Sequence, residues 1–361
     1  MLTILNVAYP LASVGLGTAG GSEQIVALLD GALTQDGHHS IVVGCGGSVV
    51  EGTLIATSCR REYFRESRRE LYDEYRTAIR RSILTYKPDV IHMHGIDVHN
   101  YIPPAGIPAL ITLHLPSEWY SPELFKLDRP RTYLNCVSST QEKTCPRSAR
   151  LLPFIKNGVS VNSFSAQTRK RRFALVLARV CPEKGIHLAI DAAAAARVPV
   201  VVGGEVFPYE VYERYFREEI APRLNRTAKF LGPVGFRRKR RLLSGAKCVL
   251  VPSLAPETSS LVAMEALASG TPVVAFAAGA LPEIVEDGVT GFLVSNERQM
   301  ADAIRRVEFI DPARCRREAV ERFSSENMVR GYYKLYAALV QSGGLPSRPS
   351  TAQPGMAAYP C

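Results

Sequence analysis

The chain has 361 residues, of which 46% are hydrophobic and 22% are charged, and its formal net charge is +10. This length predicts two domains of roughly 150–180 residues rather than one. The composition is typical of a soluble globular protein, and no run approaches the ~20 apolar residues of a membrane span.

The basic residues are clustered. One cluster covers residues 169–172, another covers 237–241, and a third basic stretch from Arg60 to Arg81 has the pattern of an amphipathic helix. Such surfaces attract anionic membranes or phosphates, but they are also common as solvated faces. No aromatic residues interleave with the clusters, so we expect no nucleic-acid partner.

The N-terminus and the cysteines predict a cytoplasmic protein. Residues 1–8 lack the basic segment of a signal peptide and have the pattern of a buried first strand. The eight cysteines contain no Cys-x-x-Cys pair, which predicts neither a zinc site nor a disulfide framework. Association with the inner face of the cell membrane stays open.

Apolar runs alternate with helical segments along the chain, which predicts an α/β fold with parallel sheets. In the first half the expected strands are 2–8, 40–44, 90–94, 109–114 and 133–138. In the second half they are 173–178, 198–203, 228–231, 248–252 and 272–275. We therefore expect two Rossmann-like domains that face each other across a cleft at the carboxyl ends of their strands.

The domain boundaries follow from changes in composition. The sequence turns polar and basic after Asn157-Gly158-Val159, so we expect a first domain at 1–160 and a second at 161–321. The segment from Glu318 to Val340 has a helical pattern, and we expect 322–341 to pack back on the first domain. Residues 342–361 are rich in Gly, Pro and Ser, which predicts a disordered tail.

A glycine-rich turn follows the first strand. Gly15-Leu-Gly17-Thr-Ala-Gly20 matches the dinucleotide-binding pattern and precedes a helix expected at 22–33. Six residues separate the strand from Gly15, however, and the second strand lacks the acidic residue that would hold a ribose. Gly20 and Gly21 are therefore predicted to approach a phosphate or a sugar, and a flexible structural turn or a nicotinamide site is the alternative.

A second candidate is a loop that carries two cations. Arg179 and Lys184 lie in the segment that leaves the strand at 173–178. Like charges on one short loop repel each other unless an anion lies between them. A diphosphate fits, because arginine can bind two oxygens at once while lysine acts as a point charge. Two unrelated surface cations are the alternative.

The most informative passage runs from Pro252 to Gly270. Glu257 and Glu265 are eight residues apart (265 − 257 = 8), with the first before a predicted helix and the second inside it. The helix is expected to begin near residues 258–260 and to end at Gly270. Its free N–H groups near residues 259–261 predict an anion site between the two carboxylates.

These passages resemble family 4 glycosyltransferases, which have the GT-B fold. The resemblance extends to about Tyr336 and also includes Gly20-Gly21-Ser-Glu23, residues 87–92 and residues 155–159. The passages that carry it in the second half are the Arg179…Lys184-Gly185 loop, Phe230-Leu-Gly-Pro-Val234, the Glu257-x7-Glu265 motif and the run from Gly279 to Val294.

The resemblance implies a role for each matched residue. Arg179 and Lys184 would stabilise the departing diphosphate. Glu257 would contact the transferred sugar, and Glu265 the ribose hydroxyls. The remaining donor contacts would come from Gly20, Gly21, the Val234 backbone and the helix start at Ser259, Ser260 and Leu261.

Two positions need comment. His114 falls where the family has a histidine near the transferred sugar, although a structural role at the rim is the alternative. Ser260 replaces a glycine that the family often has three residues after the first glutamate, which leaves the donor subtype open. His92 and His94 share one strand face but have no carboxylate or cysteine partner, so we expect structural roles and no metal site.

The resemblance also implies transfer of a hexose with retention of configuration. We expect no metal requirement, because no Asp-x-Asp motif occurs and the two cations can replace a divalent ion. The donor would be a UDP-, GDP- or ADP-sugar, and the acceptor a sugar, a lipid-linked sugar or a small metabolite, as in bacterial cell-surface polysaccharide synthesis. The alternatives are a GT-B-fold epimerase and a non-catalytic nucleotide-sugar-binding module.

Overall fold

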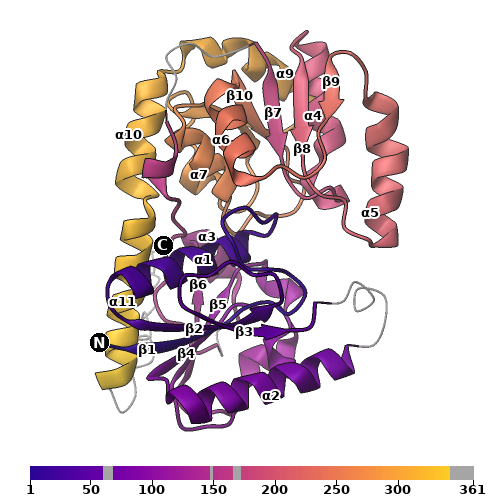
Figure 1. Cartoon of the computed structure of the whole chain (residues 1–361). Helices are drawn as coiled ribbons and strands as arrows, with labels where there is room; N and C mark the ends of the chain where they lie inside the picture. The colour runs from indigo at the N-terminus through magenta and orange to yellow at the C-terminus, as the bar shows by residue number, and fades with distance from the viewer. Residues whose placement is uncertain (60–67, 147–148, 166–171, 342–361) are drawn as a thin grey trace, which may run out of the picture.

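The computed structural model describes residues 1–59, 68–146, 149–165 and 172–341. They form two six-stranded parallel sheets with flanking helices, one in each half of the chain (Figure 1). The predicted fold class, GT-B with two Rossmann-like domains, is confirmed. Parts of two basic clusters, 60–67 and 169–171, and the predicted tail at 342–361 lie outside the described residues.

The first domain contains β1 to β6 and α1 to α3. Its strands are short apolar runs rich in β-branched residues, which suits parallel strands that are covered on both faces. The bounds are β1 Thr3–Val7, α1 Gly21–Gln35, β2 His39–Cys45, β3 Thr53–Thr57, α2 Arg69–Tyr86, β4 Val90–Met93, β5 Ala109–Leu113, β6 Thr132–Cys136 and α3 Ser139–Thr144.

The second domain contains β7 to β12 and α4 to α10. Local signals set several ends; Asp311, for example, caps α10 by accepting hydrogen bonds from the amides of Ala313 and Arg314. The bounds are β7 Ala174–Leu177, α4 Ile186–Ala195, β8 Val200–Gly203, α5 Glu210–Tyr215, β9 Ala228–Phe230, α6 Phe236–Gly245, β10 Cys248–Val251, α7 Leu261–Ala268, β11 Val273–Phe276, α8 Leu281–Ile284, β12 Gly291–Val294, α9 Glu297–Arg306 and α10 Pro312–Arg322.

The two sheets have the same topology. The strand orders are β3-β2-β1-β4-β5-β6 and β12-β11-β10-β7-β8-β9. In each sheet the order reverses beside the first strand of the domain, between β1 and β4 and between β10 and β7. Open α/β sheets bind ligands at the carboxyl ends of the strands at such a switch point, so the fold alone points to the loops after these four strands.

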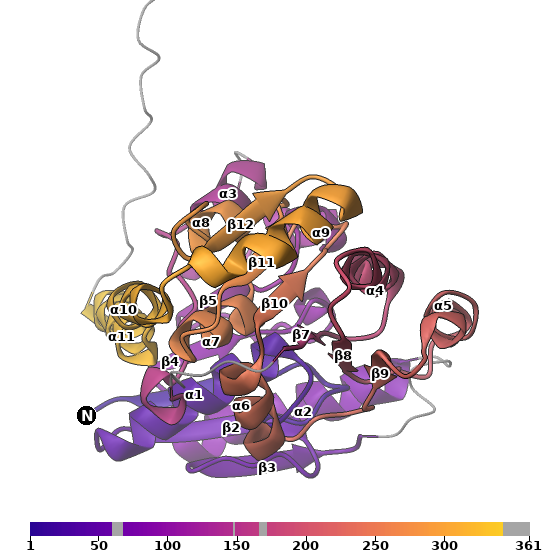
Figure 2. The ribbon, with the colours of Figure 1, turned by 90° about the horizontal axis from the view of Figure 1, so that it is seen from above.

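The C-terminal helices run along both domains. Figures 1 and 2 show α10 and α11 (Ser325–Gln341) on the same side of the molecule. Tyr332, Tyr336 and Leu339 of α11 are buried in a hydrophobic cluster of the first domain with Ile4 and Ile25. The continuous helix predicted from Glu318 to Val340 is wrong near its start, because α10 ends at Arg322 and α11 begins at Ser325.

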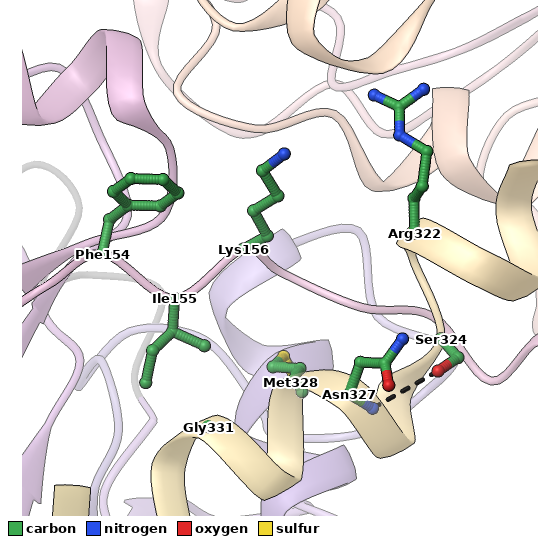
Figure 3. A pocket seen from close by; sticks show the side chains of 8 residues that line it. All are labelled: Phe154, Ile155, Lys156, Arg322, Ser324, Asn327, Met328 and Gly331. Carbon is green, nitrogen blue, oxygen red and sulfur yellow. Dashed lines mark hydrogen bonds between the residues drawn. The ribbon is translucent and has the colours of Figure 1, made fainter.

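The interruption has a tertiary cause. The chain crosses between the domains at 157–159 and again at 323–325, and the two crossings are hydrogen-bonded. Val159 N donates to the Phe323 carbonyl (2.8 Å) and Ser325 N donates to the Val159 carbonyl (2.9 Å). A cavity of about 310 Å³ lies beside the crossings, lined by Phe154, Ile155, Lys156, Arg322, Ser324, Asn327, Met328 and Gly331 (Figure 3).

One expectation about the cysteines is corrected. Cys45 and Cys59 form a disulfide with a Cα–Cα distance of 5.1 Å. Cys45 ends β2 and Cys59 follows β3, its neighbour in the sheet, so the pairing of the strands brings the two cysteines together. A spacing of 14 residues is no recognisable motif, which is why the sequence did not predict the bond. Disulfides are uncommon in the cytosol, and the cellular location stays a prediction.

Within the described residues, no helix combines the length and hydropathy that a membrane crossing requires.

Candidate functional site

The residues singled out in both halves of the sequence meet where the two domains touch. Thr258, next to Glu257, donates from its hydroxyl to the His114 carbonyl of the first domain (2.7 Å). A Cβ atom built on Gly21 would lie 3.6 Å from Leu261 Cδ1 at the start of α7. The start of α1 and the start of α7 therefore face each other across the interface.

Lys184 reaches this interface through a tight turn after β7. Residues Pro182–Lys184 form a single helical turn that ends at Gly185, whose φ is +58°. A Cβ atom on Gly185 would lie only 2.3 Å from the Pro252 carbonyl oxygen. Both the positive φ and this close approach therefore require glycine at the position. The close approach places Lys184 Nζ 2.5 Å from Glu257 Oε1.

Both the side chain and the backbone of Glu257 are fixed by contacts within the second domain. The Ser253 hydroxyl donates to the same carboxylate oxygen as Lys184, and the Ala280 amide donates to the Glu257 carbonyl (2.6 Å). Gly279, with φ +59°, packs against the Glu257 backbone so closely that a Cβ atom would lie 2.2 Å from that carbonyl oxygen. The predicted cation and carboxylate thus form one ion pair, of which the carboxylate is the more buried partner.

Arg179 is partly exposed and, within the part of the chain that the structure describes, its guanidinium makes no hydrogen bond or ion pair, although its carbonyl accepts from the Cys181 thiol. Its guanidinium lies near Glu23 of α1, a buried carboxylate that sequence reasoning did not select as a site residue. Burial raises the pKa of Glu23, and the hydrogen bonds from its own amide and from Ser22, with the charge of Arg179, offset this in part. A Cβ atom on Gly20 would collide with the Glu23 carboxylate.

Glu265 has a partner that the sequence did not reveal. Lys239 Nζ lies 2.5 Å from Glu265 Oε1 and 3.2 Å from Gln24 Oε1 of the first domain. Burial raises the pKa of Glu265, and the Lys239 charge opposes that shift. Lys239 was read as one of five consecutive surface cations. The Phe236 ring lies under the Lys239 ammonium, 5.5 Å from ring centre to nitrogen. Because Phe236 precedes Lys239 by three residues, it could have indicated that Lys239 lies on the inward face of the helix.

The start of α7 offers hydrogen-bond donors. The helix begins at Leu261, slightly later than predicted, and Ser260 occupies the N-cap position without a side-chain cap bond. The Ser259 hydroxyl oxygen is buried and has no partner among the described residues. The helix therefore presents backbone N–H groups and one hydroxyl that an anion could use.

The histidines at the ends of β4 and β5 are neutral. His114 Nε2 and His94 Nδ1 are 3.0 Å apart, and burial lowers the pKa of His114 to about 4. His92 is fully buried and bonds to Tyr336 and Thr112, as a structural residue does. No group of three or more His, Cys, Asp or Glu side chains in the described ranges has a geometry that could hold a metal ion.

Val234 lies in the loop after β9. A Cβ atom built on Gly203, which ends β8, would lie 2.6 Å from Val234 Cγ2, so this loop covers the end of that strand. The structure thus brings Arg179, Lys184 and Glu257 to strand ends of the second domain and Glu265 to α7, with His114, Gly20 and Gly21 across the interface.

Comparison with known proteins finds similarity to glycosyltransferases. Residues 171–308 match the model of the family described as glycosyl transferases group 1. Two D-inositol 3-phosphate glycosyltransferases are similar over short stretches: that of Nocardioides sp. is 41% identical over 115 residues and that of Actinosynnema mirum 48% over 81 residues. These stretches are 30% and 22% of this chain and span only 25% and 19% of those relatives.

Solved structures resemble nearly the whole chain. AviGT4, a glycosyltransferase involved in avilamycin A biosynthesis, is 25% identical with a TM-score of 0.68, over 94% of this chain and 98% of its own. A sucrose-phosphate synthase from Thermosynechococcus elongatus is 21% identical with a TM-score of 0.77, over 93% and 99%. HepE from Anabaena, solved with UDP and glucose, is 18% identical with a TM-score of 0.74, over 94% and 100%.

Proposed function

We propose that the chain transfers a hexose from a nucleotide-diphosphate sugar to an acceptor, which is supported by the match of residues 171–308 to the glycosyl transferases group 1 model. The observation that carries the proposal is the convergence of Lys184, Glu257 and the start of α7 at the interface of two Rossmann-like domains. A UDP-sugar is the first donor to test, since HepE binds UDP; GDP- and ADP-sugars are the alternatives.

The donor diphosphate would lie at the start of α7. There it accepts hydrogen bonds from the helix N–H groups and the Ser259 hydroxyl. It also replaces Glu257 as the ion-pair partner of the Lys184 ammonium. Arg179 supplies the second cation. Glu257, once released, accepts hydrogen bonds from the hydroxyls of the transferred sugar, and Glu265 does so from the ribose.

The transfer step follows from this placement. The bond between the anomeric carbon and the phosphate oxygen breaks, a bond to the acceptor oxygen forms on the same face, and the departing phosphate takes the acceptor proton. The sugar passes through an oxocarbenium-like state while negative charge grows on the diphosphate. Lys184, Arg179 and the helix N–H groups are preorganised for that charge, and neutral His114 binds a sugar hydroxyl.

The donor site is tested first by ligand stabilisation. We expect one nucleotide sugar in a panel of UDP-, GDP- and ADP-sugars to raise the melting temperature, since a ligand at 100 times its Kd adds about 2.7 kcal/mol. Glu265→Ala should abolish this shift. A shift that persists in Glu265→Ala would remove this carboxylate from the donor site.

Catalysis is tested through Lys184. Loss of one charge-assisted contact to the leaving group costs about 2–4 kcal/mol of barrier, so Lys184→Ala should lower kcat by roughly 30- to 1000-fold. Lys229→Ala, an exposed lysine on β9, is the matched control. Activity near wild type in Lys184→Ala would refute this role. Unchanged turnover in excess EDTA is expected if the two cations supply the charge that a metal provides elsewhere.

Product analysis separates the rivals. A retaining transferase gives a product with the donor's anomeric configuration and only when an acceptor is present. A GT-B-fold epimerase converts the nucleotide sugar without an acceptor, and a binding module gives a thermal shift without turnover.

The acceptor is proposed only by class: a sugar, a lipid-linked sugar or a small metabolite. Four arginines on α6 are exposed, Arg237, Arg238, Arg240 and Arg241, so a membrane-linked acceptor is favoured by charge. Sedimentation with anionic but not zwitterionic vesicles, lost when the four arginines are changed to glutamine, would support this. Equal sedimentation with both vesicle types would contradict it.

A further inference from the structure

The backbone around His114 is fixed from within its own domain. Gln141 Nε2 donates to the carbonyls of Leu113 and Leu115, both at 2.8 Å. The Tyr120 hydroxyl accepts hydrogen bonds from the amides of His114 (2.8 Å) and Leu115 (3.2 Å). Gln141 and Tyr120 are buried, so the position of this turn depends on α3, the helix that carries Gln141.

The second domain holds the same helix. Glu283 of α8 accepts four hydrogen bonds from its first residues: from the amide (3.3 Å) and hydroxyl (3.0 Å) of Ser139, and from the amide (2.7 Å) and hydroxyl (2.6 Å) of Thr140. Partial burial acts to raise the pKa of Glu283, but these hydrogen bonds outweigh it and hold the pKa below its usual range. The carboxylate is therefore ionised at neutral pH.

The second domain also holds the turn directly. The Thr258 hydroxyl donates to the His114 carbonyl (2.7 Å), and Thr258 follows Glu257 in the chain. Glu283 is linked to the same loop, because Gly279 and Ala280, just before α8, pack on the Glu257 backbone. Two contacts thus connect the Glu257 loop to the His114 turn, one direct and one through α3.

We propose that Thr258 and Glu283 are positioning residues that set His114 and Glu257 in register when the two domains close on a donor. This inference rests on the proposed transferase function and adds two residues to it. The reacting groups sit on different domains, and misplacement by about 1 Å can lower a rate by 100-fold. Neither side chain is assigned to the substrate; each acts through the backbone that it holds.

The test uses pairs of near-isosteric variants of the full chain. Thr258→Val removes the hydroxyl, and Thr258→Ser restores it. Glu283→Gln removes the charge and replaces one of the two acceptor oxygens by an N–H₂ group, which weakens the hydrogen bonds from Ser139 and Thr140 to the oxygen that remains. Thr77→Val and Glu286→Gln are the controls, because both side chains are exposed and Glu286 lies just after α8, the helix that carries Glu283.

We expect kcat to fall 10- to 100-fold in Thr258→Val and Glu283→Gln, while donor affinity, measured by nucleotide titration, changes less than twofold. Thr258→Ser should recover most of the rate, and the two losses should not multiply in the double variant. Wild-type kcat in either variant, or equal loss of donor affinity and kcat, would overturn the proposal.

A second readout does not depend on activity. The amides of His114 and Leu115 should exchange hydrogen faster in both variants than in wild type and in the controls, because the turn loses its support. Unchanged protection in both variants overturns the proposal even if the chain transfers sugar. Faster exchange without turnover of any nucleotide sugar by wild type would instead place the failure in the proposed function.

Discussion

The two ion pairs of the site differ in how strongly the loss of one partner should affect the protein. Lys184 and Glu257 are partly accessible, and an incoming diphosphate can exchange partners with them. Lys239 and Glu265 are more enclosed, with side-chain exposures of 12% and 6%. Removal of one partner from such a pair leaves a buried charge without a partner. This destabilises the folded protein by more than the ion pair itself stabilises it.

Lys239→Met should therefore destabilise the protein by about 3 kcal/mol at neutral pH. Burial already raises the pKa of Glu265, and loss of the ammonium raises it further. A raised pKa means that the folded state binds the proton more tightly than the unfolded state, so the loss should shrink as pH falls from 8 to 5. Urea unfolding at both pH values measures this. The exposed Lys229→Met is the control, and an equal loss there would contradict the prediction.

The three clustered histidines predict a pH dependence of stability. Burial lowers the pKa of His92, His94 and His114, the last to about 4. The unfolded chain takes up protons on these residues below about pH 6.5 while the folded chain does not. The free energy of unfolding should thus fall as pH drops from about 6.5 toward 4. His92→Gln should flatten this curve, and an unchanged slope would assign it to other groups.

At the scale of elements, glycines set how closely the loops of the second domain approach Glu257. Gly279 and Gly288 both have positive φ, +59° and +74°, but only Gly279 meets backbone atoms, whereas Gly288 faces open space. The backbone conformation alone costs about 1–2 kcal/mol for a residue with a Cβ atom. Gly288→Ala should lose that amount and keep its activity.

Gly279→Ala should lose clearly more stability than Gly288→Ala and should also impair turnover, because the added Cβ atom pushes on the Glu257 backbone. Thermal unfolding and kcat measured on both variants test this. Equal effects in the two would show that the close contact relaxes without moving the Glu257 loop.

The sequence predicted most elements, and its misses have physical causes. Ten of the twelve strands were expected near their observed positions; β3 and β12, edge strands of five and four residues, were not selected, because a short apolar run such as Gly291–Val294 does not by itself distinguish a strand. The break at Phe323 contains no Pro or Gly and arises from the contact with Val159. Lys239 was missed because the packing of the helix, and not the run of basic residues, decides which of their side chains points into the protein.

At the scale of the whole molecule, the first domain is not continuous in sequence. The first sheet is covered by α11 from the C-terminal end of the chain, and the Tyr336 hydroxyl bonds to His92 Nδ1 at 2.7 Å. The chain therefore crosses between domains twice, at two hydrogen-bonded points. A double crossing of this kind restrains the motion of the two domains relative to each other.

This arrangement predicts that a change in α11 destabilises the first domain. Tyr332 is fully buried against that sheet, and Tyr332→Ala should cost about 3–5 kcal/mol. Trp119, the single tryptophan of the chain, lies in the first domain, so its fluorescence should report a transition at lower urea. Tyr333→Ala, the neighbour that is only half-buried and bonds to Asp36, should cause a smaller shift. If the Trp119 transition stays in place while circular dichroism shows a loss elsewhere, α11 would stabilise the second domain instead.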